Sequence, residues 1–437
     1  MPRFEPFPGV RYDLGGVDVS AVVAPPYDVV GPADRADLAA RSPYNAVHVD
    51  VVDDAAIAAR TGDAQGGCTA LSVPGSERPT GYDTAGCRFE EWLAAHVLAV
   101  DPEPSFYVYR MGYRDDDGRP RQTTGVVGAL ELSVPGEGTG RDAVLPHERT
   151  LPKAKDDRLR LMRACRANLS PVWCLTLAQG LSALCEPSGT PTAICTDDDG
   201  VHHRLWRITQ PAVTRAISDL VASAPVVIAD GHHRYETALA YRDERRAANG
   251  DHPADYDLLM ALVVELAPDE LGVRAIHRLL TGLPDGFDLP GALSGQFDPA
   301  PIRSGDARTG PESGGPMLVT AEGSWVLTTR PAESAGAAGA PGEPGKSGEP
   351  GDDDPPDSEM LDAALASLPP HTLGFDHRAA YVEAEVAAGR AQAGFLLRPV
   401  AVGQIAAAAR AGRRMPEKTT FFSPKPRTGM VFRRVTG

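Results

Sequence analysis

The sequence predicts a protein of the α/β to α+β class, with mixed sheets and an additional α+β subdomain. Segments rich in β-branched and aromatic residues alternate with segments whose apolar residues recur at helical spacing. Such alternation is typical of folds in which helices pack on sheets. The 437 residues provide enough chain for roughly two to four domains.

In the first half of the chain, apolar periodicity predicts the helices and strands. One face of a helix is formed by residues at i, i+3, i+4, i+7, i+8 and i+11, which are Phe89, Trp92, Leu93, His96, Val97 and Val100. A second helix is expected over 156–169, where an aspartate can cap its start. Strands are expected over 106–110, 124–134, 171–177, 191–195 and 203–208.

Residues 225–266 predict a strand, a tight turn, a helix and a second strand. The apolar run 225–230 is the first strand, 234–246 has helical spacing, and 257–266 is again an apolar run. Farther along, helices are expected over 361–368, 381–389 and 402–412, and strands over 394–400, 417–424 and 429–435, the last two as a closing pair.

Two segments differ from the rest in composition. Residues 61–80 are rich in Gly, Ser, Thr and Pro and predict an inserted loop. Residues 331–358 carry glycine at every third position together with proline and an acidic end, which predicts a disordered low-complexity insertion. We therefore expect an α/β core over 1–330 and a C-terminal α/β segment over 359–437 that packs back on it.

The net charge of −16 argues against general binding to nucleic acids or anionic membranes, because phosphate groups are repelled at long range. It is compatible with a small basic pocket for a phosphorylated metabolite. No run of 18 apolar residues and no signal-peptide pattern is present, so we expect no membrane span and a cytoplasmic protein. The six cysteines lack CxxC spacing, and we expect them to be free thiols.

The strongest candidate motif is Asp230-Gly231-His232-His233-Arg234, where a predicted strand gives way to a predicted helix. A helix N-terminus offers free backbone N–H groups and a partial positive charge, which bind anions. Gly231 permits a tight turn, and the side chains that follow it add donors for phosphate oxygens. Asp230 can bind a metal ion or fix a histidine tautomer. The alternative is that the histidines only cap and pack the turn.

A second candidate lies in residues 145–158, LPHERTLPKAKDDR. His147 and Glu148 are suited to general acid–base catalysis, and Glu148 can also bind a divalent cation. Lys153 and Arg158 add positive charge that can hold an anion. The alternative is a solvated charged loop before a helix.

Several other polar residues are weaker candidates. Tyr27 and Asp28 follow two prolines that hold the chain extended, so they can line a pocket or form an edge turn. His202 and His203 have no partner at metal-ligand spacing, and we expect them to be exposed. The remaining candidates, each of which has a surface role as its alternative, are His277, Arg278, Lys418 and Lys425.

Taken together, these motifs resemble a bacterial and archaeal family catalogued as "domain of unknown function 1015", over nearly the whole chain. The matching segments, in the family's order, are APPYDVV, FYVYR, LPHERTLPKAKDDRL, NLSPVWCL, IADGHHRYETALAYRDE, VRAIHRLL and MPEKTTFFSPKPRTGM. The chain departs from the family in the inserts near 61–80 and 331–358 and at Pro426-Arg427. These departures leave the motif residues unchanged.

The strand–DGHHR–helix unit is also similar to the phosphate-binding box of the ParB/sulfiredoxin superfamily. That superfamily includes nucleotide-binding switches and kinases that act on free serine. The resemblance implies a ParB/sulfiredoxin-like core, and it assigns phosphate binding to Gly231, His232, His233 and Arg234. It does not imply a redox role, because residues 229–235 contain no cysteine.

The sequence therefore favours an enzyme that binds a nucleotide or phosphorylated small metabolite and catalyses phosphoryl transfer or phosphate-ester hydrolysis. The resemblance points to serine or phosphoserine as a related substrate. The catalytic candidates are Asp28, His147, Glu148 and Asp230, and Glu148 and Asp230 would hold a divalent cation, expected to be Mg²⁺. A homo-oligomer is compatible with this interpretation. The alternative is a non-catalytic nucleotide-binding regulator or scaffold, whereas the charge disfavours a ParB-like DNA-binding protein.

Overall fold

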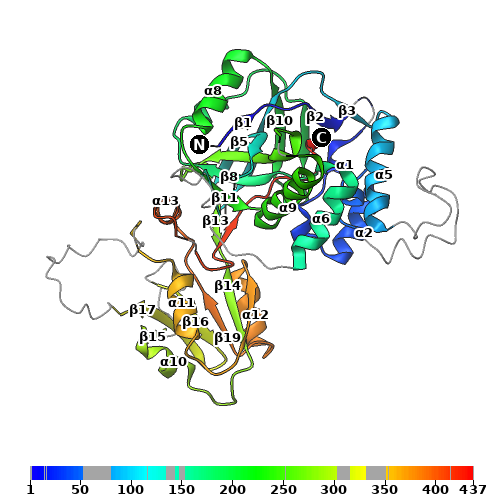
Figure 1. The fold of residues 1–437 in the computed structure, drawn as a ribbon. Helices are drawn as coiled ribbons and strands as arrows, with labels where there is room; N and C mark the ends of the chain where they lie inside the picture. The colour runs from blue at the N-terminus through cyan, green and yellow to red at the C-terminus, as the bar shows by residue number, and fades with distance from the viewer. Residues whose placement is uncertain are drawn as a thin grey trace, which may run out of the picture. The chain divides into compact units, whose positions relative to one another are not determined.

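The computed structural model describes residues 2–13, 15, 17–52, 80–115, 117–133, 143–146, 153–250, 252–302, 315–330, 351–352, 354–413 and 415–436. These residues form two compact units (Figure 1). Unit 1 contains the described residues up to Gly272 together with those from Pro424 onward, and unit 2 contains Val273–Ser423.

The main sheet of unit 1 is mixed. Its strands, in order across the sheet, are β6 (Val144–Pro146), β11 (Val226–Asp230), β8 (Val172–Thr176), β12 (Leu258–Glu265), β5 (Pro120–Glu131), β4 (Phe106–Arg114), β10 (His202–Ile208) and β9 (Ala193–Thr196), and β1 (Phe4–Glu5) pairs with β5. β11 runs parallel to β6 and antiparallel to β8. Residues 226–229 are all buried, as expected for an apolar strand covered on both faces.

Helices cover this sheet and supply its core contacts. α9 (His232–Asn249), α6 (Lys153–Cys165) and α5 (Gly81–Ala94) lie side by side (Figure 1). One buried cluster joins Val226 of β11 to Ala238 of α9 and to Ile217 of α8 (Pro211–Val221). The remaining short helices of unit 1 are α1 (Val19–Val22), η1 (Tyr27–Val29), α2 (Pro32–Arg41), α3 (Val47–Asp50), α7 (Leu181–Leu184) and η3 (Asp255–Asp257).

A smaller sheet ties the C-terminal segment into unit 1. Its strand order is β3 (Leu98–Val100), β2 (Gly9–Tyr12), β21 (Phe432–Arg434) and β7 (Ala167–Asn168). β21 is therefore an interior strand, with β2 on one side and β7 on the other. Phe432 is fully buried against the neighbouring helices, so the segment after residue 423 is part of the core of unit 1.

Unit 2 has its own sheet and its own core. The strand order is β15 (Phe297–Pro301), β17 (Gly323–Thr329), β16 (Met317–Thr320), β19 (Ala393–Leu396), β14 (His277–Thr281) and β18 (Thr372–Asp376), and β13 (Val273–Ala275) pairs separately with β20 (Thr420–Phe422). Its helices are α10 (Leu289–Ala292), η4 (Leu293–Gly295), α11 (Asp357–Leu365), α12 (Ala379–Ala387) and α13 (Val402–Arg410). Buried residues of β14, β19 and α11 form the main cluster.

The mixed α/β class and several sheets are confirmed, and the ParB/sulfiredoxin-like core stays a prediction. The helix expected through Val100 is wrong at its end, because α5 stops at Ala94 and β3 follows. His96 adopts a φ of 56° between them. Leu98 is buried while Val100 is 49% exposed, which is the alternation of a strand rather than a helix.

The prediction that the last two strands pair with each other is also wrong, because they lie in different sheets. β20 pairs with β13 in unit 2, and β21 pairs with β2 and β7 in unit 1. The apolar pattern identifies each strand correctly but contains no information on its partner. None of the helices in the described ranges is both long and apolar enough to cross a membrane.

The compositional segments are described only in part. Residues 61–79 and 331–350 lie outside the described residues. Asp357 and Ser358, at the end of the expected low-complexity insertion, begin α11 and are buried. Cys87 is disulfide-bonded, so the expectation of free thiols is wrong at that position. Four further cysteines, Cys165, Cys174, Cys185 and Cys195, are free and buried.

Candidate functional site

The candidate site begins at the turn between β11 and α9. The apolar strand ends at Asp230, and Gly231 adopts a φ of +93°, a left-handed conformation that favours glycine. The helix then starts at His232, and Gly231 provides no side-chain cap for its first N–H groups. The motif therefore has the strand–turn–helix placement that its sequence predicts.

The side chain of Arg234 folds back across this turn. Its Nη2 donates to Asp230 Oδ2 at 2.6 Å, and its Nη1 donates to Ser170 Oγ at 3.1 Å and to the carbonyl of Pro171. A Cβ on Gly231 would lie 2.9 Å from Nε of Arg234, so the glycine makes room for the guanidinium. The side chain is only 10% exposed.

Lys425 connects this turn to the N-terminal segment. Its Nζ donates to Asp230 Oδ1 at 2.6 Å and to Asp28 Oδ2 at 2.7 Å. Burial alone would raise the pKa of Asp230, but the charges of Lys425 and Arg234 outweigh it and hold that pKa below its ordinary value. Burial lowers the pKa of Lys425, and the two carboxylates more than offset this, so the ammonium stays charged.

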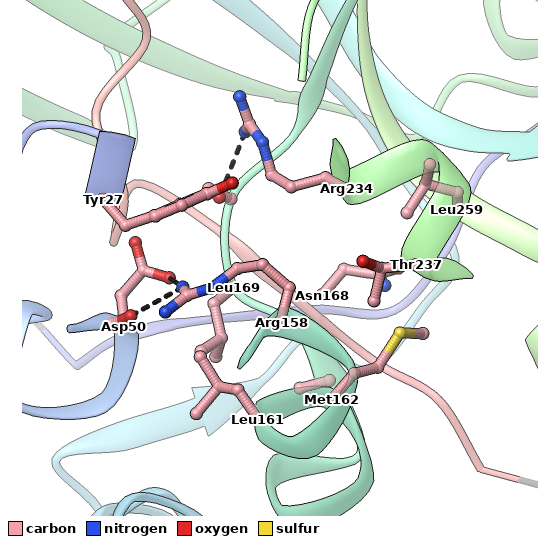
Figure 2. A pocket seen from close by; sticks show the side chains of 12 residues that line it. Tyr27, Asp50, Arg158, Leu161, Met162, Asn168, Leu169, Arg234, Thr237 and Leu259 are labelled. Atoms are coloured by element: carbon pink, nitrogen blue, oxygen red, sulfur yellow. Dashed lines mark hydrogen bonds and ion pairs between the residues drawn. The ribbon is translucent and has the colours of Figure 1, made fainter. Parts of the chain in front are cut away.

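A small open pocket, with a cavity volume of about 50 Å³, lies beside Arg234. Figure 2 shows the side chains that line it. They are Tyr27, Asp50, Arg158, Leu161, Met162, Ala167, Asn168, Leu169, Ser170, Arg234, Thr237 and Leu259. Five of these side chains are apolar, and the others supply two guanidinium groups, one carboxylate, one amide and three hydroxyl groups. All of these residues belong to unit 1.

Arg158 is the second buried cation of the pocket. Its side chain is 8% exposed, and its Nη1 donates to the carbonyl oxygen of Asp50 at 2.8 Å and to Oδ1 of the same residue at 3.2 Å. The guanidinium lies over the ring of Tyr27, 3.9 Å from its centroid. Both side chains are drawn in Figure 2. Burial raises the pKa of Asp50 although Arg158 and Arg234 oppose the shift.

Two buried polar atoms at this pocket have no hydrogen-bond partner among the described residues. One is Nε of Arg234, and the other is Oγ1 of Thr237, whose residue is 2% exposed. Buried donors and acceptors are normally satisfied, because an unmade hydrogen bond costs about 1–3 kcal/mol. A ligand with acceptor oxygens would supply the missing partner for Arg234.

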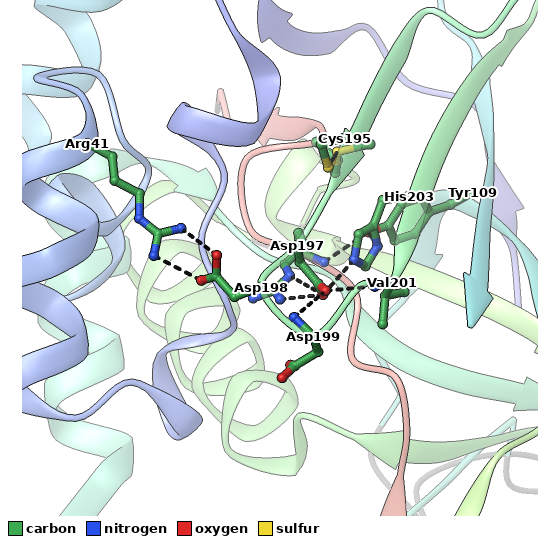
Figure 3. A network of polar contacts seen from close by, with 10 residues as sticks. Arg41, Tyr109, Cys195, Asp197, Asp198, Asp199, Val201 and His203 are labelled. Carbon is green, nitrogen blue, oxygen red and sulfur yellow. Dashed lines mark hydrogen bonds and ion pairs between the residues drawn. The ribbon is translucent and has the colours of Figure 1, made fainter. Parts of the chain in front are cut away.

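The pair His202–His203 lies elsewhere, and the expectation that both are exposed is wrong. His203 is fully buried, and its Nε2 donates to Asp197 Oδ2 at 3.0 Å. The hydroxyl of Tyr109 lies 2.8 Å from its Nδ1. Figure 3 shows His203 beside Asp197 in this network. Arg427 binds the same carboxylate, so this network fastens the C-terminal segment to the β9–β10 turn. We assign it a structural role.

A comparison of the sequence with protein families finds a match over most of the chain. A family described as "Protein of unknown function (DUF1015)" matches residues 4–341. The chain belongs to the DUF1015 family. This match covers β11, the turn and α9, whereas Lys425 lies beyond it. No curated protein matches this DUF1015 chain.

Solved structures resemble the DUF1015 chain only distantly. A conserved hypothetical protein from Pyrococcus furiosus is 11% identical, covering 65% of this chain and 88% of its own, with a TM-score of 0.35. A free serine kinase in complex with AMP is 12% identical, with coverage of 64% and 84% and a TM-score of 0.35. SbnI from Staphylococcus aureus, truncated at its C-terminus, is 10% identical, with coverage of 69% and 85% and a TM-score of 0.36. At these values, the likeness carries no argument about activity.

The structure brings together part of the predicted site. Lys425 binds both Asp28 and Asp230. Arg234 binds Asp230 directly. Asp28 is far from the other residues in sequence. Tyr27 and Arg158 line the same pocket as Arg234. His232 and His233 occupy the first turn of α9 and are half-buried.

Other predicted residues of the DUF1015 chain are placed elsewhere or not described. His147 and Glu148 lie outside the described residues, and Lys153 is known only as the first residue of α6. His277, Arg278 and Lys418 belong to unit 2. Their participation in the predicted site therefore stays a prediction.

Asp50, Ser170 and Thr237 were missed by the sequence reasoning. Asp50 had one local signal, since it is a carboxylate within the apolar run VHVDVV. Ser170 lies in the segment NLSPVWCL, but serine there has no pattern of its own. Thr237 lies one helical turn after Arg234, on the same side of α9, and this spacing could have identified it.

The structure offers limited support for the predicted metal site. In the part of the chain that it describes, no group of three or more His, Cys, Asp or Glu side chains could hold a metal ion. The oxygens of Asp230 accept hydrogen bonds from Lys425 and Arg234 instead. Since Glu148 is not described, the divalent cation stays a prediction.

Proposed function

We propose that unit 1 binds a nucleotide or a phosphorylated small metabolite through Arg158 and Arg234, and that it catalyses phosphoryl transfer or phosphate-ester hydrolysis there. The observation that supports this proposal is the pair of guanidinium groups, each at least nine-tenths buried, on the wall of one pocket. Guanidinium groups bind phosphate oxygens in a fixed, forked geometry. Nε of Arg234 has no hydrogen-bond partner among the described residues, so it is a donor that a ligand in this pocket can use.

The binding energy comes from charge-assisted hydrogen bonds in a poorly solvated place. Each such bond contributes roughly 1.5–3 kcal/mol, more than a bond between neutral groups. The aspartates around the pocket hold the arginines in position before a ligand arrives, because Arg158 is bound by Asp50 and Arg234 by Asp230. Pre-positioned donors stabilise the charge that a transferring phosphoryl group develops.

The transfer itself requires a nucleophile and a proton acceptor. A water or substrate hydroxyl oxygen forms a bond to phosphorus while the bond to the leaving oxygen breaks, and the leaving oxygen keeps the electron pair. Asp50 is the carboxyl group at the pocket whose pKa is raised, which suits it to accept the proton of the nucleophile. Asp230 has a lowered pKa, so it acts through charge and position instead.

The finer parts of the proposal concern the substrate and the cation. A serine-like hydroxyl compound is the acceptor suggested by the sequence resemblance. Mg²⁺ would neutralise phosphate oxygens opposite the arginines, with Glu148 and Asp230 as its proposed ligands. Calorimetric titrations with and without Mg²⁺ separate these contributions, because the arginine contribution persists when the metal is removed.

The decisive experiment compares arginine variants of the full chain. Inorganic phosphate, pyrophosphate and AMP are titrated calorimetrically against the wild type, Arg234→Lys, Arg234→Ala and Arg158→Lys. We expect Arg234→Ala to weaken phosphate binding by about ten- to a hundredfold, since it removes one or two charge-assisted bonds. Arg234→Lys should lie between the wild type and Arg234→Ala, because it keeps the charge but loses the fork.

Arg242 provides the matched control on the same helix. It is 8% exposed and donates to the carbonyl of Leu132, but it does not line the pocket. Arg242→Lys should change stability without changing the affinity for phosphate. Equal affinities in Arg234→Ala and Arg242→Lys would contradict the proposed site. Phosphate binding without turnover of phosphate esters would favour the non-catalytic alternative.

A further inference from the structure

Arg278 of unit 2 is a fully buried arginine that the proposed function does not use. Its Nη1 donates to the carbonyls of Ile276 at 2.7 Å and Lys418 at 2.9 Å. Across the sheet, Arg278 of β14 lies directly opposite Phe375 of β18, and its guanidinium stacks on that ring at 4.7 Å. Burying a charge is costly unless the charge is paired and hydrogen-bonded. Here the arginine fixes both an aromatic ring and the loop around Lys418.

A pocket lies beside this arginine, entirely within unit 2. It is open to solvent and has a cavity volume of about 600 Å³. Its walls come from α11, from β18 and the residues before it, and from the segment before β20. The lining residues are Glu359, Asp362, Leu365, Ala366, His371, Leu373, Phe375, Met415, Pro416 and Glu417. Phe375 is 44% exposed, which is unusual for so large an apolar side chain.

The polar side chains that line this pocket are three carboxylates and one histidine. No lysine or arginine is among its described lining residues, and carboxylates are acceptors only. Asp362 Oδ1 is buried without a hydrogen-bond partner among the described residues, and its nearest cation is Nε of Arg278 at 3.9 Å. His371 donates its Nδ1–H to the carbonyl of Pro369, which leaves its Nε2 as an acceptor.

These features require a ligand that combines a flat apolar surface with N–H donors. An organic cation fits less well, because Phe375 already carries the guanidinium of Arg278 on its ring, and a second cation on that ring would be repelled. Glu359 and Glu417 are exposed, so water already solvates their charges. A neutral aromatic ring avoids the repulsion, gains stacking on Phe375 and can donate to Asp362.

We infer that this pocket binds a purine base, stacked on Phe375 and held by Asp362, with guanine preferred. Guanine presents two adjacent donors, N1–H and the 2-amino group, and these match the two oxygens of one carboxylate. Hypoxanthine presents N1–H alone. Adenine presents a lone pair at N1, which the carboxylate repels. This binding site belongs to unit 2 and does not depend on the phosphate site proposed for unit 1.

The test uses nucleosides, which carry no phosphate, in equilibrium dialysis against the full chain. We expect affinity to fall in the order guanosine, inosine, adenosine. Base–aromatic stacking is worth about 1–3 kcal/mol, so Phe375→Leu should weaken guanosine binding by about five- to a hundredfold. Asp362→Asn should remove the preference for guanosine over adenosine, because the amide offers only one acceptor oxygen.

Two control variants share the chemistry but lie outside the pocket. Tyr381 is 40% exposed and stacks on Arg378, so Tyr381→Leu removes a comparable aromatic–cation pair. Glu383→Gln neutralises an exposed acid of α12. Neither should change guanosine binding. The inference is wrong if no nucleoside binds, if the three nucleosides bind equally, or if the organic cation spermidine displaces guanosine from the wild type. Phosphate titrations of unit 1 are unaffected by any of these outcomes.

Discussion

The ammonium group of Lys425 lies 2.6 Å from the carboxylate of Asp230, which is 195 residues earlier in the chain. The same ammonium lies 2.7 Å from Asp28, a further partner separated by 397 residues. One lysine thus joins the N-terminal segment, the β11–α9 turn and the C-terminal segment of unit 1. Because its side chain is only 12% exposed, water cannot readily replace these contacts.

Replacing Lys425 by methionine should destabilise unit 1. The substitution keeps the length of the side chain but leaves two carboxylates facing each other without a cation. We expect the free energy of unfolding to fall by about 2–3 kcal/mol, below the full value for a buried pair because Asp28 is partly exposed. Urea unfolding measures the change. The control is Arg41→Met, which breaks exposed pairs with Asp37 and Asp198 and should cost at most about 1 kcal/mol. Equal losses in the two variants would contradict the prediction.

Gly231→Ala should cost more stability than a matched glycine substitution. Both Gly231 and Gly180 have left-handed φ angles, +93° and +97°, before a helix. A Cβ at Gly180 meets only Leu220 at 3.7 Å, so Gly180→Ala reports the backbone strain alone, about 1–2 kcal/mol. A Cβ at Gly231 would displace the guanidinium of Arg234 as well. Thermal unfolding should show the larger loss for Gly231→Ala, and phosphate affinity should fall in that variant alone.

His277 should make unit 2 less stable in acid. Burial lowers its pKa to about 4, and Nδ1 accepts a hydrogen bond from the backbone N–H of Leu397, which a protonated ring cannot do. At pH values between 4 and the ordinary pKa of histidine, His277 binds a proton in the unfolded chain but not in the folded chain. The free energy of unfolding therefore falls as the pH drops through this range, by at most about 3 kcal/mol.

His277→Asn is the matching variant, because an amide oxygen can accept the same bond without binding a proton. Its unfolding, followed from pH 7 to pH 4, should lack this part of the pH dependence. His252→Asn removes an exposed histidine and should keep the wild-type profile. A wild-type profile in His277→Asn would show that other groups cause the acid sensitivity.

Replacing residues 331–350 with a short Gly/Ser linker should leave the melting temperature within about 2 °C of the wild type, because their composition cannot bury much apolar surface. These residues lie outside the described part of the chain. Extending the replacement through residue 358 should lower the melting temperature by many degrees. It removes Asp357, which is buried and accepts a bond from Arg398 at 2.6 Å. A large effect of the shorter replacement would contradict the composition argument.

Local patterns predicted the strand–turn–helix unit of the site correctly. The apolar run before Asp230 and the helical spacing after Arg234 are both short-range signals, and a glycine between them is an ordinary turn residue. The end of the helix after Phe89 could not be predicted in this way. It depends on pairing between β3 and β2, whose residues are far apart in sequence.

The partners of the charged residues also could not be predicted, because they are far apart in sequence. Nothing near Lys425 indicates that it binds Asp28, since that contact exists only when the C-terminal segment enters unit 1. The conformation of Arg234 could not be predicted from local sequence either. A first-turn arginine has access to solvent in an isolated helix, but Ser170 and Asp230 draw it inward here.

Unit 1 is built from two segments that are separated in sequence by unit 2, and this affects how a nascent chain folds. β21 and Lys425 follow unit 2 in the sequence, so the ribosome makes residues 273–423 before either becomes available. At about 5–20 residues per second, that takes roughly 8–30 s. During this interval β2 and β7 lack the strand between them, and Asp28 and Asp230 lack their shared cation. Early release of the polypeptide would leave an open sheet edge, which is a template for aggregation and a substrate for chaperones.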